Sequence, residues 1–429
     1  MPKVLIVTYY WPPAGGPGVQ RVLKFAKYLP ALGWEPIILT VKNGNFPAID
    51  ESLIDDIPAG IKVYKTSILE PFELYKKFSG IKKDDKIPVA VLAGENLTGK
   101  QKVMHWIRSN MFIPDAKIGW FGYGVKAGME IIRNENPDLI MSSSPPPTVH
   151  LIAGKLAKQA NLPWLADFRD PWTGIHYYRQ LNRNKFAAQK DENLERSVLK
   201  HADVVLSASS AFANLLKLPE GKKAEVITNG FDGELANNSN QSRSEKFDIL
   251  YIGGLTTNRF YKQFFESFAK LSRNNNQFAN LARIRIAGSV NQEILDEITE
   301  IIPKENFSYL GYLPHYKAEE LMHESALNLL LMEKTSNYAG HIPGKIFEYL
   351  AAGNPILGIG DPAGDSAEIL KTSGLGKMHK YDCNWEDVLQ TSFENWLNNE
   401  LPIPNIDYIN QFHRQKLCEK LTKIFNRLL

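Results

Sequence analysis

The sequence predicts two doubly wound α/β domains, each built on a parallel β-sheet. Short apolar runs rich in Val and Ile alternate with segments of helical periodicity along most of the chain. Continuous apolar strands separated by helices are typical of parallel sheets that are covered on both faces. The pattern runs through twice, with a polar stretch between the two series. A chain of 429 residues is also too long for one compact core.

The first series predicts an N-terminal domain over residues 1–235. Lys3–Tyr10 is expected to be a buried strand, followed by a helix over Val19–Leu32 that ends at Gly33. Apolar residues of this helix recur on one face, as packing on a sheet requires. Further strands are expected at Glu35–Thr40, Leu139–Ser143, Pro163–Asp167, Val204–Ser207 and Glu225–Thr228.

The second series predicts a C-terminal domain over residues 236–407, after a linker within Phe231–Lys246 that is rich in Gly, Asn and Ser. Its strands are expected at Asp248–Ile252, Ile284–Ala287, Phe307–Leu310, Leu327–Met332 and Pro355–Gly360. Its helices are expected at Tyr261–Asn274, Asn291–Ile301, Lys317–Glu324, Gly344–Ala352 and Ser366–Thr372. An amphipathic helix over 408–429 is expected to pack back on the first domain. Ligands bind beyond the carboxyl ends of such strands, so we expect the domains to face a central cleft.

Composition and charge exclude several protein classes. A formal net charge of +3 is too small to indicate nucleic-acid binding, and no run of about eighteen apolar residues predicts a transmembrane helix. Cys383 and Cys418 lie far apart in sequence and lack the spacing of metal ligands, so reduced thiols in a cytoplasmic protein and no metal site are expected. Between Leu74 and Phe121, basic residues outnumber acidic ones and alternate with aromatics. This stretch is either a solvated surface with buried aromatics or a patch for an anionic membrane surface, which would be a peripheral contact at the inner face of the membrane.

In the first domain, a glycine loop and a charged loop are candidates for the acceptor side. Gly15, Gly16 and Gly18 allow positive φ and close approach of a ligand, although a purely structural turn remains an alternative. The third glycine of a dinucleotide fingerprint is missing, and the second strand ends without an acidic residue, which argues against NAD. After a later strand follow the charged residues Asp167, Arg169 and Asp170, which form either an ion-pair network or a substrate site. We favour the site. His150, one turn into a helix, contacts the ligand or simply packs.

In the second domain, the loop after the first strand carries Gly253, Gly254, Asn258 and Arg259. Small residues admit phosphates, and an arginine there binds their oxygens and stabilises a departing diphosphate. A surface turn with a solvated arginine is the alternative.

The most informative segment is the start of the helix Gly344–Ala352. Lys345 and Glu348 lie three residues apart and therefore on one helix face, which suits a nucleoside diphosphate, with Lys for phosphate and Glu for the ribose hydroxyls. An exposed ion pair within the helix is the alternative. The next helix opens with Gly364, Asp365 and Ser366, whose N–H groups are candidates for holding the diphosphate.

With these residues the chain resembles the family-4 glycosyltransferases of the GT-B fold, especially bacterial surface-polysaccharide members. The matching segments are Lys3–Gly18, Asp167–Trp172, Val226–Asp232, Tyr251–Leu255, Ile284–Gly288, Leu310–Pro314 and Lys345–Pro355. The resemblance implies donor binding by the C-terminal domain, acceptor binding by the N-terminal domain, retention of anomeric configuration, and no metal or other cofactor. It places Glu348 on the glutamate that holds the donor ribose and Arg259 at a lysine that contacts the diphosphate, with Lys345 close by. The predicted catalytic residues are Arg259, Lys345, Asp167 and Asp170.

Two positions depart from the family pattern. Gly254 stands where many members have arginine, and Gly340 stands where many have a glutamate that contacts the transferred sugar. His341 and Glu333 are candidate substitutes for that glutamate. Gly340 therefore leaves open whether transfer is altered or abolished.

The sequence thus predicts a retaining hexosyltransferase that uses a UDP- or GDP-sugar and a polysaccharide or lipid-linked acceptor. A nucleotide-sugar epimerase and a non-catalytic nucleotide-sugar-binding protein are the alternatives. An epimerase would form product without an acceptor.

Overall fold

Contacts divide the chain into two compact units. The computed structural model describes residues 1–46, 48–69, 99–236, 244–335 and 338–429. One unit comprises Met1–Thr228 together with Leu417–Leu429, and the other comprises Asn229–Lys416. The division after Thr228 falls a few residues before the boundary expected near residue 235, because the loop that begins at Asn229 already packs with the second unit.

The first unit is built on a seven-stranded parallel sheet in the order β3-β2-β1-β4-β5-β6-β7. Its strands are β1 (Lys3–Thr8), β2 (Glu35–Val41), β3 (Lys62–Thr66), β4 (Leu139–Ser144), β5 (Trp164–Phe168), β6 (Val204–Ser207) and β7 (Glu225–Val226). The order reverses beside β1, because the chain first winds outward to β3 and then returns to place β4 on the other side. The predicted doubly wound sheet is confirmed, and its edge strand β3 was not predicted.

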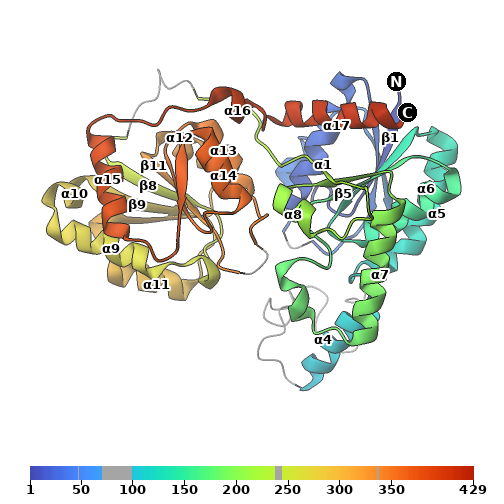
Figure 1. Ribbon diagram of the computed structural model, residues 1–429, viewed down its shortest axis with the longest axis horizontal. Coiled ribbons are helices and arrows are strands. Elements are labelled where there is room, and N and C mark those ends of the chain that lie inside the picture. The colour runs from blue at the N-terminus through green and yellow to red at the C-terminus, as the bar shows by residue number, and fades with distance from the viewer. Residues whose placement is uncertain (47, 70–98, 237–243, 336–337) are drawn as a thin grey trace. The chain divides into compact units, whose positions relative to one another are not determined.

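Helices cover both faces of this sheet (Figure 1). They are α1 (Pro17–Tyr28), α5 (Phe121–Glu135), α6 (Thr148–Ala160), α7 (Lys185–His201), α8 (Ser210–Leu215) and α17 (Arg414–Leu428). Helix α4 (Gly99–Met111) lies away from the sheet and contacts α7. Alternate residues of β1 point to opposite faces. Val4 and Ile6 therefore share a core with α1 and α17, whereas Leu5 and Val7 share one with α5, α6 and α7.

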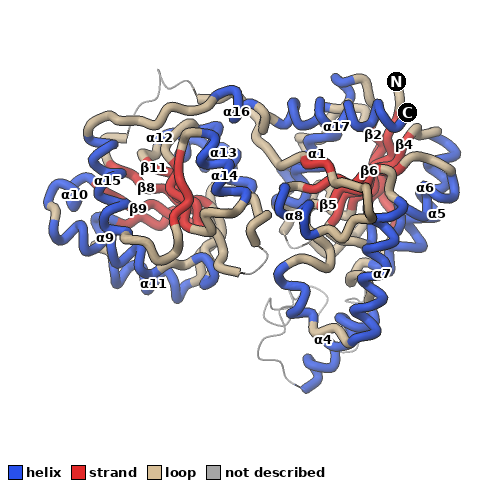
Figure 2. The backbone as a smooth tube through the Cα atoms, in the orientation of Figure 1, coloured by secondary structure: helices blue, strands red, loops and turns tan. Residues whose placement is uncertain are grey.

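The second unit repeats this architecture with six parallel strands in the order β10-β9-β8-β11-β12-β13. The strands are β8 (Phe247–Ile252), β9 (Ala282–Ala287), β10 (Phe307–Gly311), β11 (Leu327–Leu331), β12 (Ile356–Ile359) and β13 (Gly376–His379). The helices are α9 (Lys262–Asn274), α10 (Asn276–Leu281), α11 (Gln292–Ile301), α12 (His315–Glu324), α13 (Gly344–Ala352), α14 (Asp365–Ser373), α15 (Trp385–Leu397) and α16 (Ile406–Asn410). One core holds side chains of α9, α10, α11 and α15, and the other holds side chains of α12, α13 and α14. Figure 2 shows the strands of each unit enclosed by helices.

The C-terminal segment is not the single helix expected over 408–429. A turn separates α16 from α17, because the backbone there pairs with another segment: Phe231 N–H donates to Phe412 O, and Arg414 N–H donates to Phe231 O. Ile409 and Phe412 contribute to a core of the second unit. The apolar face of α17 lies in the core of the first unit, with Leu417, Cys418, Leu421, Ile424 and Phe425.

The basic and aromatic stretch Leu74–Phe121 lies in large part outside the described residues, which exclude 70–98. Of its aromatics that are described, Trp120 is fully buried and Trp106 is exposed. Within the described ranges, no helix is long and apolar enough to cross a membrane.

Candidate active site

The carboxyl ends of β8 and β9 bring two glycines into close contact in the second unit. Gly253 and Gly288 follow these strands with φ of 125° and 126°. A Cβ added at Gly288 would lie 2.3 Å from the Gly253 carbonyl oxygen. Only glycine fits this approach and this backbone conformation. The loop after β8, with Gly254 and Asn258 exposed, therefore lies close against the loop after β9.

Lys345, in the first turn of α13, points toward the end of β8. Its Nζ donates to Ile252 O at 2.8 Å and lies 3.8 Å from the centroid of the Tyr251 ring. Tyr251 Oη in turn donates to Gly254 O at 2.8 Å. Burial lowers the pKa of Lys345 well below its ordinary value; nearby Arg259 lowers it further, and Glu348 raises it. An ammonium group held in such surroundings gains more from an added anion than a solvated one does.

Arg259 ends the short helix η5 (Thr257–Arg259) and is ion-paired. Its Nη2 lies 2.9 Å from Glu333 Oε1, just beyond β11, and the two side chains are 26% and 19% exposed. The solvated surface arginine of the alternative interpretation is therefore wrong. Arg259 Nε is buried and has no hydrogen-bond partner among the described residues. The Nη1 of Arg259 lies 3.5 Å from Gly254 O, so the guanidinium is held between the loop after β8 and Glu333 and stays partly open to solvent.

Glu348 lies one turn along α13 from Lys345, and its side chain points to a different partner. Its Oε1 lies 3.4 Å from Nε2 of His315, the first residue of α12. Lys345 donates to Ile252 instead, so the ion pair within the helix that we considered as an alternative is not what orients these two residues. Arg259 and Glu348 both act on the charge of Lys345, since Arg259 lowers its pKa and Glu348 raises it, so Lys345 links the three predicted donor residues.

The start of α14 is tied to the segment that contains Gly340. Asp365 N–H donates to Ala339 O at 2.8 Å, and Ser366 Oγ donates to His341 O at 2.8 Å. A Cβ at Gly364 would lie 3.0 Å from Ala339 O. The N–H of Asp365 is thus engaged within the chain, and it is not one of the free groups that the sequence led us to expect.

Both candidate substitutes for the missing glutamate lie beside this segment. Glu333, Tyr338 and His341 line one small cavity with Ser366 and Asp361. The rings of Tyr338 and His341 stack with centroids 4.3 Å apart. Glu333, just beyond β11, and His341, shortly before α13, thus both reach this cavity, as expected if either takes the place of the missing glutamate.

In the first unit, the glycine loop is bound by its own chain. Gly15 N–H donates to Ala48 O at 2.8 Å, and Gly16 has a φ of 92° where it precedes α1. Gly18 O accepts from Arg169, and a Cβ at Gly18 would lie 3.3 Å from Arg169 Nη1. These are the contacts of a structural turn.

Asp167 lies in the core as part of an ion-pair network. It is fully buried, and its two carboxylate oxygens accept from Arg21 Nη2 and Nε at 2.8 Å and 2.9 Å. Ser143 Oγ donates to Oδ2 at 2.7 Å. Although burial alone would raise its pKa, Arg21 and Ser143 hold the pKa of Asp167 below its ordinary value. The substrate site that we favoured for Asp167 is therefore wrong, because Arg21 and Ser143 enclose its carboxylate in the core.

Arg169 and Asp170, which follow Asp167 in the sequence, lie in different surroundings. Arg169 is buried and donates to the carbonyl oxygens of Ser144, Pro145 and Gly18, so it joins the loops after β4 and β5 to the start of α1. Asp170 lines a cavity of about 310 Å³. Burial raises its pKa above the ordinary value.

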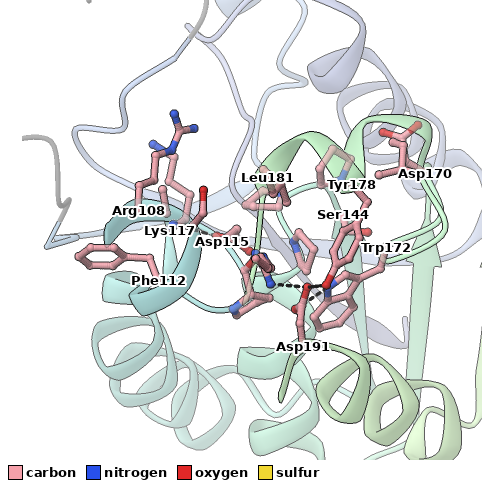
Figure 3. A pocket seen from close by; sticks show the side chains of 18 of the residues that line it. Arg108, Phe112, Asp115, Lys117, Ser144, Asp170, Trp172, Tyr178, Leu181 and Asp191 are labelled. Carbon is pink, nitrogen blue, oxygen red and sulfur yellow. Dashed lines mark hydrogen bonds and ion pairs between the residues drawn. The ribbon is translucent and has the colours of Figure 1, made fainter. Parts of the chain in front are cut away.

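This cavity lies beyond the carboxyl ends of β1, β4 and β5 (Figure 3). Its lining includes aromatic, proline and basic side chains. At its floor, Asp191 accepts from Trp172 Nε1 at 2.9 Å and Tyr178 Oη at 2.8 Å, and it is ion-paired with Arg183. Proline and aromatic side chains form much of the wall, and Arg108 and Lys117 lie at one side of the cavity (Figure 3).

His150 packs in the core and does not line this cavity. Its ring stacks on Phe168 at 4.4 Å, and its Nδ1 lies 2.8 Å from Ser142 Oγ. Burial lowers its pKa to about 3, so the imidazole is neutral. The prediction of a ligand contact by His150 is therefore wrong, because its place on the inner face of α6 turns it to the sheet.

This neutral histidine predicts a pH-dependent stability. In the unfolded chain His150 gains a proton below about pH 6.5, whereas the folded protein takes it up only near pH 3. The stabilisation that the neutral His150 contributes to the free energy of unfolding is therefore fully present above pH 6.5. It falls by about 1.4 kcal/mol per pH unit as the pH drops toward 3. Urea unfolding between pH 4 and 7 should give a shallower slope for His150→Gln than for the wild type. The exposed control His201→Gln should keep the wild-type slope, and equal slopes for all three would contradict the assignment.

Neither cysteine is in a disulfide, and burial raises the pKa of Cys418 to about 12. The part of the chain that the structure describes contains no group of three or more His, Cys, Asp or Glu side chains placed to hold a metal ion.

Comparison with known proteins decides the family. The model of glycosyltransferase family 4 matches residues 16–235. The chain belongs to glycosyltransferase family 4. Its fold is GT-B, shared with HepE from Anabaena, solved with UDP and glucose, at a TM-score of 0.60 and 12% identity over 100% of both chains. Sucrose-phosphate synthase from Thermosynechococcus elongatus matches at a TM-score of 0.63 and 13% identity, covering 100% of this chain and 99% of that one.

TarM is a further solved structure of this fold, with a TM-score of 0.62 and 12% identity over 99% of each chain. A search of curated protein sequences gave no match. Membership in family 4 makes this chain a glycosyltransferase, and the structural matches at these identities concern its fold.

Proposed function

We propose that this glycosyltransferase moves a hexosyl group from a UDP- or GDP-sugar to a glycan or lipid-linked acceptor, with retention of anomeric configuration and without a metal ion. The observation that carries the proposal is the grouping of Arg259, Lys345 and Glu348 at one edge of the second sheet. Two cations and one carboxylate match a diphosphate followed by a ribose. HepE, which has the same fold, was solved with UDP and glucose, and this supports a UDP-sugar as the donor.

In the proposed reaction, an acceptor hydroxyl forms a bond to the anomeric carbon while the bond from that carbon to the diphosphate breaks. The proton of the hydroxyl passes to the departing diphosphate. Arg259 and Lys345 stabilise the charge that develops on this leaving group. Glu348 accepts hydrogen bonds from the ribose hydroxyls and so holds the nucleotide in place.

The cavity of the first unit is our candidate for the acceptor side. Asp170 lies on its lining, and Arg108 and Lys117 border it. Asp167 and His150 are enclosed in the core, so we assign them no contact with substrate.

A binding screen tests the donor assignment. The intact protein is heated with UDP-sugars, GDP-sugars, UDP and GDP, and its melting temperature is recorded. A ligand at 100 times its Kd adds about 2.7 kcal/mol to the stability, which such a scan detects. No stabilisation by any of these compounds would overturn the proposal.

The same screen separates the alternatives once a donor is found. Product formed without an acceptor would identify an epimerase, and binding without transfer or slow hydrolysis would identify a non-catalytic binding protein. The glycine at position 340 makes the second outcome worth testing.

Truncation of Glu348 tests the ribose contact. Glu348→Ala is expected to raise the donor KM by one to two orders of magnitude, as the loss of a hydrogen-bonded carboxylate of about 1.5–3 kcal/mol implies. Steady-state kinetics at saturating acceptor measure this change. An unchanged KM would remove Glu348 from the site.

A further inference from the structure

Glu348 is held by a histidine from the neighbouring helix. His315 begins α12, and its Nε2 lies 3.4 Å from Glu348 Oε1 while its Nδ1 lies 3.3 Å from Glu319 Oε1. Both ring nitrogens therefore face a carboxylate, one on α13 and one on its own helix. An imidazole donates from both nitrogens only when it is protonated. The geometry is that of an imidazolium between two carboxylates.

The charges around this cluster favour the protonated form. Glu319 and Glu348 raise the pKa of His315 above its ordinary value, although partial burial opposes them. His315 in turn lowers the pKa of Glu319, which His323 and Arg414 also face. Glu348 also raises the pKa of Lys345 on the same helix, although the Lys345 side chain points to Ile252 O. Arg414 is itself 2.9 Å from Asp232. Each carboxylate of the cluster thus has a cation beside it, and His315 is charged at neutral pH.

The exposure of the pair indicates what it contributes. The His315 side chain is 62% exposed and that of Glu348 is 26% exposed. An ion pair so open to solvent adds little to stability. The packing of α12 against α13 depends instead on buried apolar residues such as Met322, Ile346 and Phe347. The pair therefore acts mainly on the orientation of the Glu348 side chain.

We propose that His315 is a positioning residue, which fixes Glu348 so that its carboxylate is ready to accept the ribose hydroxyls. The inference rests on the proposed function, which assigns those hydroxyls to Glu348. A glutamate side chain that is already ordered loses less conformational freedom when the nucleotide binds. Glu319 holds the imidazole from the other side and keeps it charged.

Binding measurements on the intact chain test this role. Titration calorimetry with UDP and with GDP gives the Kd of the wild type, His315→Gln, His315→Lys and the exposed control His201→Gln. We expect His315→Gln to weaken binding of the preferred nucleotide roughly three- to tenfold, in line with one ordered side chain. His315→Lys should restore most of the affinity because it keeps a cation at this place. His201→Gln should bind as the wild type does.

Two further measurements separate positioning from a merely structural role. In turnover, His315→Gln should raise the donor KM and leave kcat unchanged, as expected for a residue that affects binding only. In NMR titrations, the pKa of the His315 imidazole should lie above its ordinary value and fall in Glu319→Gln and in Glu348→Gln.

Some results would overturn the inference and leave the proposed function intact. One is wild-type binding by His315→Gln while Glu348→Ala binds weakly. Another is a loss of nucleotide affinity in His315→Gln that His315→Lys does not restore and that is accompanied by a lower melting temperature. Such a result would indicate a structural role for His315. If Glu348→Ala itself binds the nucleotide as the wild type does, the proposed function fails first.

Discussion

Replacing Arg259 with alanine is expected to lower the turnover number about 100- to 1000-fold, the usual effect of removing one donor to a developing negative charge. Arg259 pairs with Glu333 at 2.9 Å, and its Nε is buried without a hydrogen-bond partner among the described residues. The guanidinium is also partly exposed, so a departing diphosphate would bind at its exposed part. Release of nucleoside diphosphate from the preferred donor measures the effect.

Two further variants make this result specific to the position. Arg259→Lys keeps the charge but loses the planar pair of donors, so we expect intermediate activity. Arg273→Ala removes an exposed arginine from the last turn of α9 in the same unit and should be fully active. Wild-type turnover in Arg259→Ala, or an equal loss in Arg273→Ala, would contradict the role of Arg259.

The second large effect is on stability. Asp167→Asn is expected to destabilise the first unit by about 3–5 kcal/mol, because Arg21 would be left as a buried charge without its partner. Arg21 is 5% exposed and Asp167 is 0% exposed, so water cannot replace the lost interaction. For a unit of this size, each kcal/mol lowers the melting temperature by about 2–4 °C. Calorimetry of the intact chain should show an earlier transition for the first unit.

A double variant provides the control for this prediction. Arg21→Met combined with Asp167→Leu removes both charges and should recover most of the lost stability, since buried ion pairs are often replaceable by apolar side chains. If Asp167→Asn melts as the wild type does but loses turnover, Asp167 acts in catalysis and our structural assignment is wrong.

Much of the fold was predictable because the central strands are nearly all apolar. The strand from Val204 to Ser207 and the helix from Gly344 to Ala352 have the bounds predicted from the sequence. Whereas the edge strands β7 and β10 were predicted, the other two edge strands, β3 and β13, were missed. Their sequences KVYKT and GKMH are partly exposed and too polar to stand out from loops. A strand at the edge of a sheet has neighbours on one side only, and its sequence reflects this.

The candidate site was predictable where its residues are close in sequence. Lys345 and Glu348 follow from one helical turn, and the glycines after β8 follow from their place at the end of a strand. The partners of these residues were not predictable. Glu333 reaches Arg259, and His315 reaches Glu348, only because the sheet and helices bring distant segments together.

His150 illustrates the opposite error. Its position one turn into α6 after a proline-rich loop suggested a ligand contact. However, Ala153 and Ala157, three and seven residues later, are buried on the same helix face. Small apolar residues at these helical spacings indicate that His150 lies on the buried face of the helix, and this pattern is visible in the sequence.

Hydrogen exchange of the intact protein with and without its preferred nucleoside diphosphate tests the central claim most directly. Our account predicts slower exchange on binding in the loop 253–259, at the start of α13 around Lys345 and Glu348, and little change in the loops after β1 and β5. Protection confined to the first unit, with the segments around Arg259 and Lys345 unaffected, would contradict it.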